Sequence, residues 1–432
     1  MKFLRLGIFA LVAFGILSHG AVEDWARAAL VTGAALLFFA WALLTYVQAP
    51  ADVAVSPLFF PLVALGLFAI AQIAFRLTVS PFQTRSELQL LLAYILIMFL
   101  IPQAFRSAPE WRMLIWFLMT LGFVVAIFGI LQHLTFNGKL YWVRELRYGG
   151  IPFGPYVNRN HFAGFAEMII PVGMVPLTMG RVRRERWLMV TLFVLLPIGA
   201  LFVSASRGGV ISFGAELLLV ILVIGLRRVG GKQILAAGLV LVLAFLFAAW
   251  LGVRQIIDRF SSMQAMEVTV GKRAGMRHDS WAMFRDHLAF GTGLGTLQIV
   301  YPAYESVYDG RIVTHAHNDY LEALAETGFV GGLLCGWFIA VLFGSCLRNL
   351  LERDKPFPAA VHLSGLAACS AFLVHSMVDF NLHIPGNGLL FFVLASMATA
   401  EIGGPREVPA ERIKQADRAP EAVHVTGRIL SP

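Results

Sequence analysis

The sequence predicts an all-α polytopic membrane protein. Hydrophobic residues make up 58% of its 432 residues and charged residues only 14%, whereas a soluble domain is roughly 45–50% apolar. Apolar runs of about 18 or more residues, each long enough to cross a hydrocarbon core, recur along the chain. The net charge of +8 would suggest nucleic acid for a soluble protein. Here we expect membrane lipids and no nucleic acid as partners, because the basic residues fit cytoplasmic loops.

The apolar runs predict about twelve transmembrane helices within a transmembrane domain of residues 1–402. They cover residues 4–20, 25–47, 58–78, 86–105, 112–134, 161–179, 187–204, 208–226, 233–252, 328–347, 359–378 and 386–402. The first run has the basic start and apolar core of a signal peptide. We expect it to be retained, because Ser18-His19-Gly20-Ala21 is a poor cleavage site. The polar tail, residues 403–432, is expected to be disordered.

Basic residues in short loops predict the orientation. They follow the predicted sixth, eighth and tenth helices, at Arg181–Arg186, Arg227–Lys232 and Arg348–Lys355. If the helices alternate, these loops share a side with the chain start and the tail, so both termini are predicted to be cytoplasmic. The long segment 253–327 then faces outward. We expect a helix near residues 274–287 and turns at Gly291, Gly293 and Gly295.

The outward segment ends in a dense polar cluster, Thr314–Glu322, which contains His315, His317, Asn318 and Asp319. Two histidines beside an amide and a carboxylate predict a functional site in so apolar a chain. His315-x-His317-x-Asp319 also matches an alternating metal-ligand pattern, if the segment is extended. The hydrolases with this pattern have a soluble α/β fold and further histidine ligands. The sequence shows neither, so we expect no metal and no other cofactor.

Arginines on the same outward face indicate an anionic substrate. Arg207 lies in a tight turn between small residues, and Arg273 and Arg277 lie in the long segment. An outward arginine opposes the usual charge bias of membrane proteins, and its guanidinium group matches phosphate oxygens in a bidentate way. Asn160 and His161 enter the sixth helix from this side. The pattern favours an enzyme that acts on an anionic, lipid-linked substrate.

These motifs resemble the O-antigen ligase and polymerase family of bacterial envelope enzymes over about residues 150–390. The family signature is His-[Asn/Ser/Gln], nine residues, then Gly-x-x-[Gly/Thr/Tyr]. Here His317-Asn318 is followed by nine residues and then Gly328-Phe329-Val330-Gly331. Three further segments are similar to the family pattern: Ser206-Arg207-Gly208, Arg277-x-x-x-Trp281 followed by Gly291-x-Gly293-x-Gly295, and Asn158–Ala163.

The resemblance implies a metal-independent glycosyltransferase with a type C fold in the bacterial inner membrane. It implies an undecaprenyl-diphosphate-linked glycan as donor, His317 as the essential residue, and Arg207 and Arg277 as the groups that hold the diphosphate. The residue chemistry agrees, because a neutral imidazole suits removal of a hydroxyl proton. Two guanidinium groups can also stabilise the leaving diphosphate. We expect attack opposite the diphosphate, and hence inversion at the anomeric carbon. Asn318 is expected to orient substrate, and His315 to support it.

Several alternatives stay open at this point. A ligase would use lipid A–core as acceptor, whereas a polymerase would extend a growing glycan, and the sequence does not separate them. The segment His375–Pro385, which includes Asp379, is expected to shape the acceptor site. A transporter of lipid-linked sugars would instead carry ionisable residues near helix midpoints. The sequence analysis places them at the outer helix ends.

Overall fold

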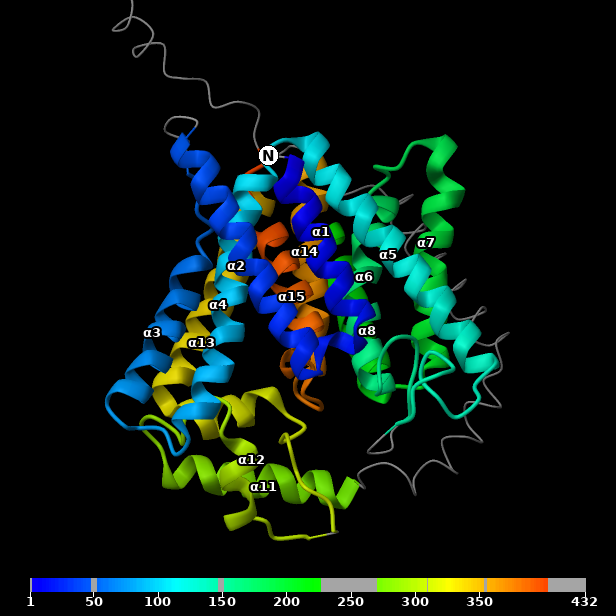
Figure 1. Ribbon diagram of the computed structural model, residues 1–432. Helices are drawn as coiled ribbons and strands as arrows, with labels where there is room; N and C mark the ends of the chain where they lie inside the picture. Colours follow the sequence, from blue (N-terminus) through cyan, green and yellow to red (C-terminus); the bar gives the residue numbers. More distant parts are fainter. Residues whose placement is uncertain are drawn as a thin grey trace, which may run out of the picture.

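The computed structural model describes residues 2–47, 53–146, 151–226, 270–308, 310–352 and 356–402. These residues form helices and connecting segments, and no β-strand occurs among them (Figure 1). The helices are α1 (Lys2–Leu17), α2 (Asp24–Val47), α3 (Phe59–Ala74), α4 (Pro81–Ala104), α5 (Ala108–Leu134), α6 (Arg159–Thr178), α7 (Arg184–Val203), α8 (Arg207–Leu226), α11 (Val270–Asp286), α12 (Leu297–Val300), α13 (Asp319–Glu352), α14 (Pro356–His375) and α15 (Pro385–Ala398).

The all-helical membrane fold is confirmed. Eleven of the twelve predicted helices correspond to α1–α8 and α13–α15, and the predicted helix 233–252 lies outside the described residues. Eight described helices are long and apolar enough to cross a membrane. Three are shorter, since α1 and α3 have 16 residues and α15 has 14. Twelve spans therefore stay a prediction.

Two helices form the centre of the bundle. About 94% of the apolar window of α6 and 78% of that of α14 is buried, against 17% for α2. Small side chains allow this close packing. At Gly365 of α14, for example, an added Cβ would lie 2.5 Å from the backbone nitrogen of Ala398 in α15. Because both central helices run through the bundle, each connects its two ends.

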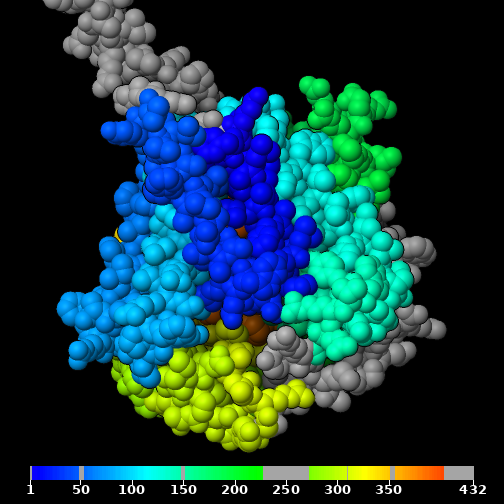
Figure 2. Space-filling model, in the orientation of Figure 1, coloured from blue at the N-terminus to red at the C-terminus, as the bar shows by residue number. Residues whose placement is uncertain are grey.

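We call these ends the site end and the basic end. The site end carries the first residues of α6 and α8, the last residues of α14, and a cap formed by residues 270–308 and 310–318. The basic end carries the last turn of α6, the loop Arg181–Arg186 and the first turn of α14. Arg5 pairs with Glu110 at the start of α5, so the chain start lies there as well. Figure 1 shows α11 and α12 at the opposite end from the N-terminus, and Figure 2 shows the cap (yellow-green) beneath the N-terminal helices.

The cap is joined to α13 by direct backbone contact at two glycines with positive φ, Gly291 (69°) and Gly328 (64°). The backbone N–H of Gly293 donates to the Glu326 carbonyl at 2.8 Å, and that of Phe329 donates to the Leu288 carbonyl at 2.7 Å. A Cβ on Gly291 would lie 2.2 Å from the Glu326 carbonyl carbon. Only glycine tolerates both this approach and this conformation. The glycine motifs thus fix the cap against the bundle.

One helix boundary was predicted wrongly. The polar cluster was expected to end in a loop before a helix at residue 328, but α13 begins at Asp319 and is interrupted at Gly328. The Asn318 side chain caps this first section, because its Oδ1 accepts from the Leu321 N–H at 3.0 Å. Consequently Asp319, Glu322 and Glu326 lie at helical spacing on one face, rather than in an extended strand.

Candidate functional site: a histidine–carboxylate network

His317 is paired with a buried carboxylate from a distant part of the chain. Its Nδ1 lies 3.2 Å from Oδ1 of Asp379, and the two side chains are 12% and 1% exposed. An ionised carboxylate only accepts hydrogen bonds, so Nδ1 carries the proton and Nε2 is left as a proton acceptor. The His317 backbone has a φ of 49°, which turns the chain just before α13. This is the arrangement of a general base with an orienting partner.

The turn that carries Asp379 is fixed to the cluster by Asn318 and Asp319. Asn318 Nδ2 donates to the Met377 carbonyl at 2.9 Å, and the Asp319 N–H donates to the Ser376 carbonyl at 2.9 Å. Because its amide oxygen also caps α13, both polar groups of Asn318 are engaged within the protein. These contacts fix the position of Asn318, and its expected role in orienting substrate stays a prediction.

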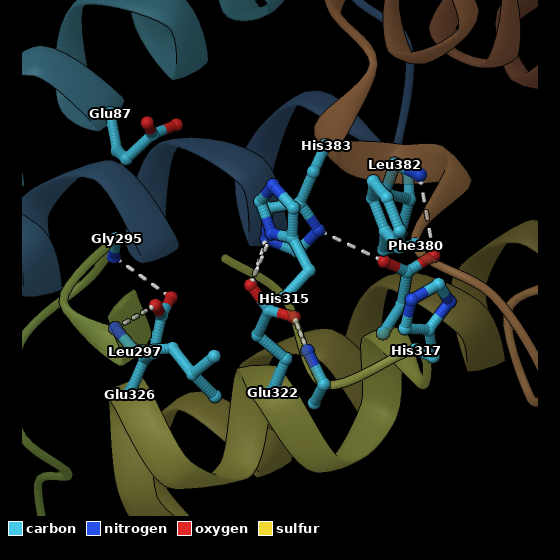
Figure 3. Close-up of polar contacts among 12 residues, drawn as sticks. Glu87, Gly295, Leu297, His315, His317, Glu322, Glu326, Phe380, Leu382 and His383 are labelled. Atoms are coloured by element: carbon cyan, nitrogen blue, oxygen red, sulfur yellow. Dashed lines mark hydrogen bonds and ion pairs between the residues drawn. The ribbon is translucent and has the colours of Figure 1, made fainter. Parts of the chain in front are cut away.

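A second network lies beside the first (Figure 3). His315 Nδ1 lies 2.8 Å from Oε1 of Glu322, and His383 Nε2 lies 3.2 Å from the same oxygen. His383 Nδ1 lies 3.0 Å from Oδ1 of Asp319. Hence the three side chains of the alternating pattern do not converge. His315 faces Glu322, His317 faces Asp379, and Asp319 faces His383.

Phe380 packs between the histidines. Its ring stacks on His315 with centroids 4.4 Å apart, and it meets His317 and His161 edge-on at 4.8 and 4.9 Å. His161, from the first turn of α6, therefore lies close to His315 and His317. Asn158 caps that turn, since its Oδ1 accepts from the backbone N–H of Asn160 at 2.9 Å.

Two groups of the site, Asp379 and His383, lie outside the spans and have shifted pKa values. Burial alone would raise the pKa of Asp379, but the hydrogen bond with His317 and the nearby histidines hold it well below its usual range. Burial alone would lower the pKa of His383. The carboxylates of Glu322 and Asp319 outweigh that effect and raise it to about 10. His383 is therefore a cation near neutral pH, in contact with two acidic side chains.

Arg207 lies next to the turn of Asp379. It is the first residue of α8, which Ser206 caps by accepting from the Gly209 N–H at 3.2 Å. A Cβ on Gly208 would lie 2.6 Å from His375 Nε2 and 3.1 Å from a Val378 methyl group. The backbone beside Arg207 is thus in contact with the residues directly before Asp379.

Arg277 and Arg273 lie one turn apart on α11, within the cap. Their neighbour Met276 packs in one small core with Val313 and Ala316, the residue between the two histidines. Among the described residues, neither guanidinium group forms an ion pair, and the buried Nε of Arg273 has no hydrogen-bond partner. By contrast, Lys272 pairs with Glu305 at 3.4 Å. The structure shows no contact of these two arginines with His317.

One group of side chains has metal-ligand geometry. Single atoms of His315, Glu322 and His383 lie within 4.8 Å of one another, and Asp319 supports His383 from behind, as carboxylates do at many metal sites. In this structure the three groups hydrogen-bond to each other. If a metal acts in this protein, this set is the candidate, rather than the sequence pattern His315-x-His317-x-Asp319.

Sequence analysis did not single out Glu322, Phe380 or His383 as site residues. Glu322 belongs to the recognised polar cluster, and the other two lie within the segment His375–Pro385. Asp319 and Glu322 are three residues apart, a helical spacing that the misplaced start of α13 concealed. His383 joins them only in space.

Ionisable residues also occur near helix midpoints, in contrast to the expectation from the sequence. Glu167 and Glu216 are fully buried near the midpoints of α6 and α8. Glu167 contacts His375 Nδ1 at 3.0 Å, whereas neither carboxylate oxygen of Glu216 has a partner among the described residues. Ionisable residues therefore do occur within the spans, as a transporter would require, so their placement no longer argues against transport.

Comparison with known proteins finds a family match over part of the chain. Residues 170–336 match the family model described as O-antigen ligase. The chain carries an O-antigen ligase family domain. This confirms the predicted resemblance. The family match includes Arg207, Arg277 and the cluster from His315 to Asp319, while Asn160, His161 and Asp379 lie outside it. It covers less than half of the chain.

A curated relative agrees with this assignment. The exopolysaccharide production protein ExoQ of Rhizobium meliloti (strain 1021) is 31% identical over 98 residues. The aligned stretch spans 22% of this chain and 22% of the relative. The matched segments of this multi-pass membrane protein are thus similar to a family described as O-antigen ligase and to a protein of exopolysaccharide production.

Proposed function

We propose that this protein transfers a glycan from an undecaprenyl-diphosphate-linked donor to a sugar hydroxyl at the periplasmic face of the bacterial inner membrane. In this proposal both termini are cytoplasmic and the site end faces the periplasm. The observation that carries it is the His317–Asp379 pair at 3.2 Å, in which His317 lies within the segment that matches the O-antigen ligase family model. The preferred activity is ligation of the glycan to lipid A–core.

The proposed reaction is a direct displacement. Nε2 of His317 removes the proton from the acceptor hydroxyl, while the oxygen attacks the anomeric carbon and forms the new glycosidic bond. The bond from that carbon to the diphosphate oxygen breaks, and the diphosphate leaves with the electron pair. Attack opposite the leaving group inverts the anomeric configuration. Asp379 holds His317 in the required tautomer and stabilises the imidazolium that forms.

The arginines are proposed to hold the donor diphosphate. Arg207 lies beside the turn of Asp379, and Arg277 lies on the cap next to the core that contains Ala316. Guanidinium groups there would stabilise the charge that develops on the leaving group. Two buried atoms beside His317, Asp379 Oδ2 and His161 Nε2, have no partner among the described residues. Such atoms can hydrogen-bond to acceptor hydroxyls.

Replacing His317 by alanine tests the proposal. In purified protein with a labelled donor and a soluble acceptor glycan, His317→Ala should lower transfer by on the order of 10²–10⁴-fold, the usual contribution of a general base. Donor binding should persist, because the arginines remain. His315→Ala is the matched control and should keep part of the activity. Normal transfer by His317→Ala would refute the role of His317 as base. Absence of any glycosidic product from the wild-type protein would favour the transporter.

We further propose that the transfer is metal-independent, since the base and the charge stabilisers come from side chains. Excess chelator should leave the wild-type rate unchanged. Inhibition by chelator, reversed by a divalent metal, would instead favour a functional metal at His315, Glu322 and His383.

The second candidate is a polymerase that joins repeat units into a growing glycan. The relative ExoQ is an exopolysaccharide production protein, which favours this candidate. A deletion strain separates the two activities. A strain lacking a ligase should accumulate polymerised lipid-linked glycan, whereas a strain lacking a polymerase should accumulate single lipid-linked repeats.

A further inference from the structure

A cavity with a clear chemical character lies at the basic end, at the opposite end of the bundle from His315, His317 and His383. It has a volume of about 600 Å³ and lies between α5, the loop from α6 to α7, and the first turn of α14. This volume is in the range of small-ligand sites, roughly 300–1,000 Å³. The central helices α6 and α14 contact the cavity at Pro176 and Pro356 and reach the site end at their other termini. The cavity is therefore separate from the proposed catalytic site.

Four arginines line this cavity, which we call the arginine pocket: Arg112, Arg181, Arg183 and Arg186. No acidic residue is among the described residues that line it. Within the described part of the chain, none of the four guanidinium groups forms an ion pair. Four cations around one hollow repel each other, and an anion bound between them removes that repulsion.

Two of the guanidinium groups are held over aromatic rings. The Cζ of Arg112 lies 4.8 Å from the Phe357 ring centre, and that of Arg186 lies 5.7 Å from the Trp116 ring. Such stacking restricts the side chains but leaves the N–H groups at the guanidinium edge available. A phosphate group accepts hydrogen bonds from this edge in a bidentate way. The stacked arginines are thus preorganised for a phosphate.

The remaining wall of the arginine pocket is apolar. It includes Ile115, Met119, Val190 and Val361, which come from three helices of the bundle. A free phosphate ion gains nothing from apolar contacts, whereas the glycerol and upper acyl regions of a lipid do. Basic pockets between helices on the cytoplasmic side of a membrane protein are suited to anionic headgroups.

We propose that the arginine pocket binds the phosphate headgroup of an anionic phospholipid in the leaflet opposite the catalytic site. The arginines contact the phosphate, and the apolar wall contacts the first carbons of the lipid. The pocket is a structural lipid site in addition to the donor site. This proposed lipid site does not depend on the proposed glycosyl transfer.

Thermal unfolding of the purified full chain in neutral detergent tests this proposal. Phosphatidylglycerol in mixed micelles should raise the unfolding midpoint by on the order of a few degrees relative to phosphatidylcholine. The Arg183→Gln/Arg186→Gln double variant should lose most of this difference. The matched control is Arg76→Gln/Arg85→Gln, which removes two exposed arginines at the site end and should respond like the wild type.

Three results would overturn the proposal. The first is equal stabilisation of the wild type and the Arg183→Gln/Arg186→Gln variant by phosphatidylglycerol. The second is an equal loss of stabilisation in the control, which would indicate a general charge effect. The third is an equal shift with inorganic phosphate at the same concentration, which would indicate a site for a small anion. Arg186→Gln alone provides a second variant if the double variant does not fold.

Discussion

The two ends of the bundle differ in how their charged and titratable side chains are paired. At the site end, His317, His315 and His383 each contact a buried carboxylate. At the basic end, none of the four arginines of the arginine pocket forms an ion pair with a carboxylate of the described residues. Buried, paired charges hold a geometry that chemistry can use, because each group fixes the next. Unpaired cations around a hollow favour an external anion. The same central helices thus connect a fixed site to an open one.

The largest expected difference between the two ends is the side of the membrane that each one faces. In a variant without native cysteines, Tyr308→Cys in the cap should react with a membrane-impermeant thiol reagent in cells with a permeable outer membrane. Arg184→Cys at the basic end should not react, because the basic loops are predicted to be cytoplasmic. Both positions are exposed in the structure, so accessibility alone does not separate them. Reaction of Arg184→Cys from outside would overturn the proposed orientation.

The arginines at the site end should have a large effect on catalysis. Arg207→Ala or Arg277→Ala should each lower turnover by at least about a hundredfold, the loss expected for one preorganised charge stabiliser. Lysine at either position should restore part of the rate, because it keeps the charge but not the bidentate geometry. The rate is measured with saturating labelled donor. Full activity of both lysine variants would reduce their role to general electrostatics.

His383 should make stability depend on alkaline pH. Its folded pKa of about 10 lies above the usual unfolded value of roughly 6.5. Its ion pairs therefore stabilise the protein fully below about pH 6.5, and this contribution is lost as the pH rises through about 10. The unfolding midpoint should fall over this range by on the order of a few degrees more in the wild type than in His383→Gln. His278→Gln, on the exposed surface of α11, is the control. Identical slopes in wild type and His383→Gln would show that His383 is not held as a cation.

Many of the features compared above could be predicted from the sequence alone. Hydropathy located α1–α8 and α13–α15, and glycine spacing located the turns at Gly291 and Gly293, which have φ values of 69° and 115°. Loop charges grouped Arg181–Arg186 with the chain start, and the structure places both at the basic end. The segment Arg227–Lys232 lies outside the described residues. These features are local, so a single stretch of chain reveals them.

Contacts between segments that are far apart in the chain could not be predicted from local sequence patterns. His383 meets Glu322 across 61 positions of chain, and no periodic pattern connects a short turn after α14 to the first turn of α13. The buried Glu167 and Glu216 were overlooked because each is a single acidic residue in an apolar run. The arginine pocket was recognised only as a basic loop, because its cavity depends on the packing of α5, α7 and α14.

The central claim is that Asp379 acts through His317, and a double-mutant cycle tests it most directly. Asp379→Asn should lower transfer by between about tenfold and the 10²–10⁴-fold contribution of the base itself. In the His317→Ala background, where long incubations with radiolabelled donor measure the residual rate, Asp379→Asn should have almost no further effect, because its partner is gone. An equal loss in both backgrounds would contradict the account, since Asp379 would then act independently of His317.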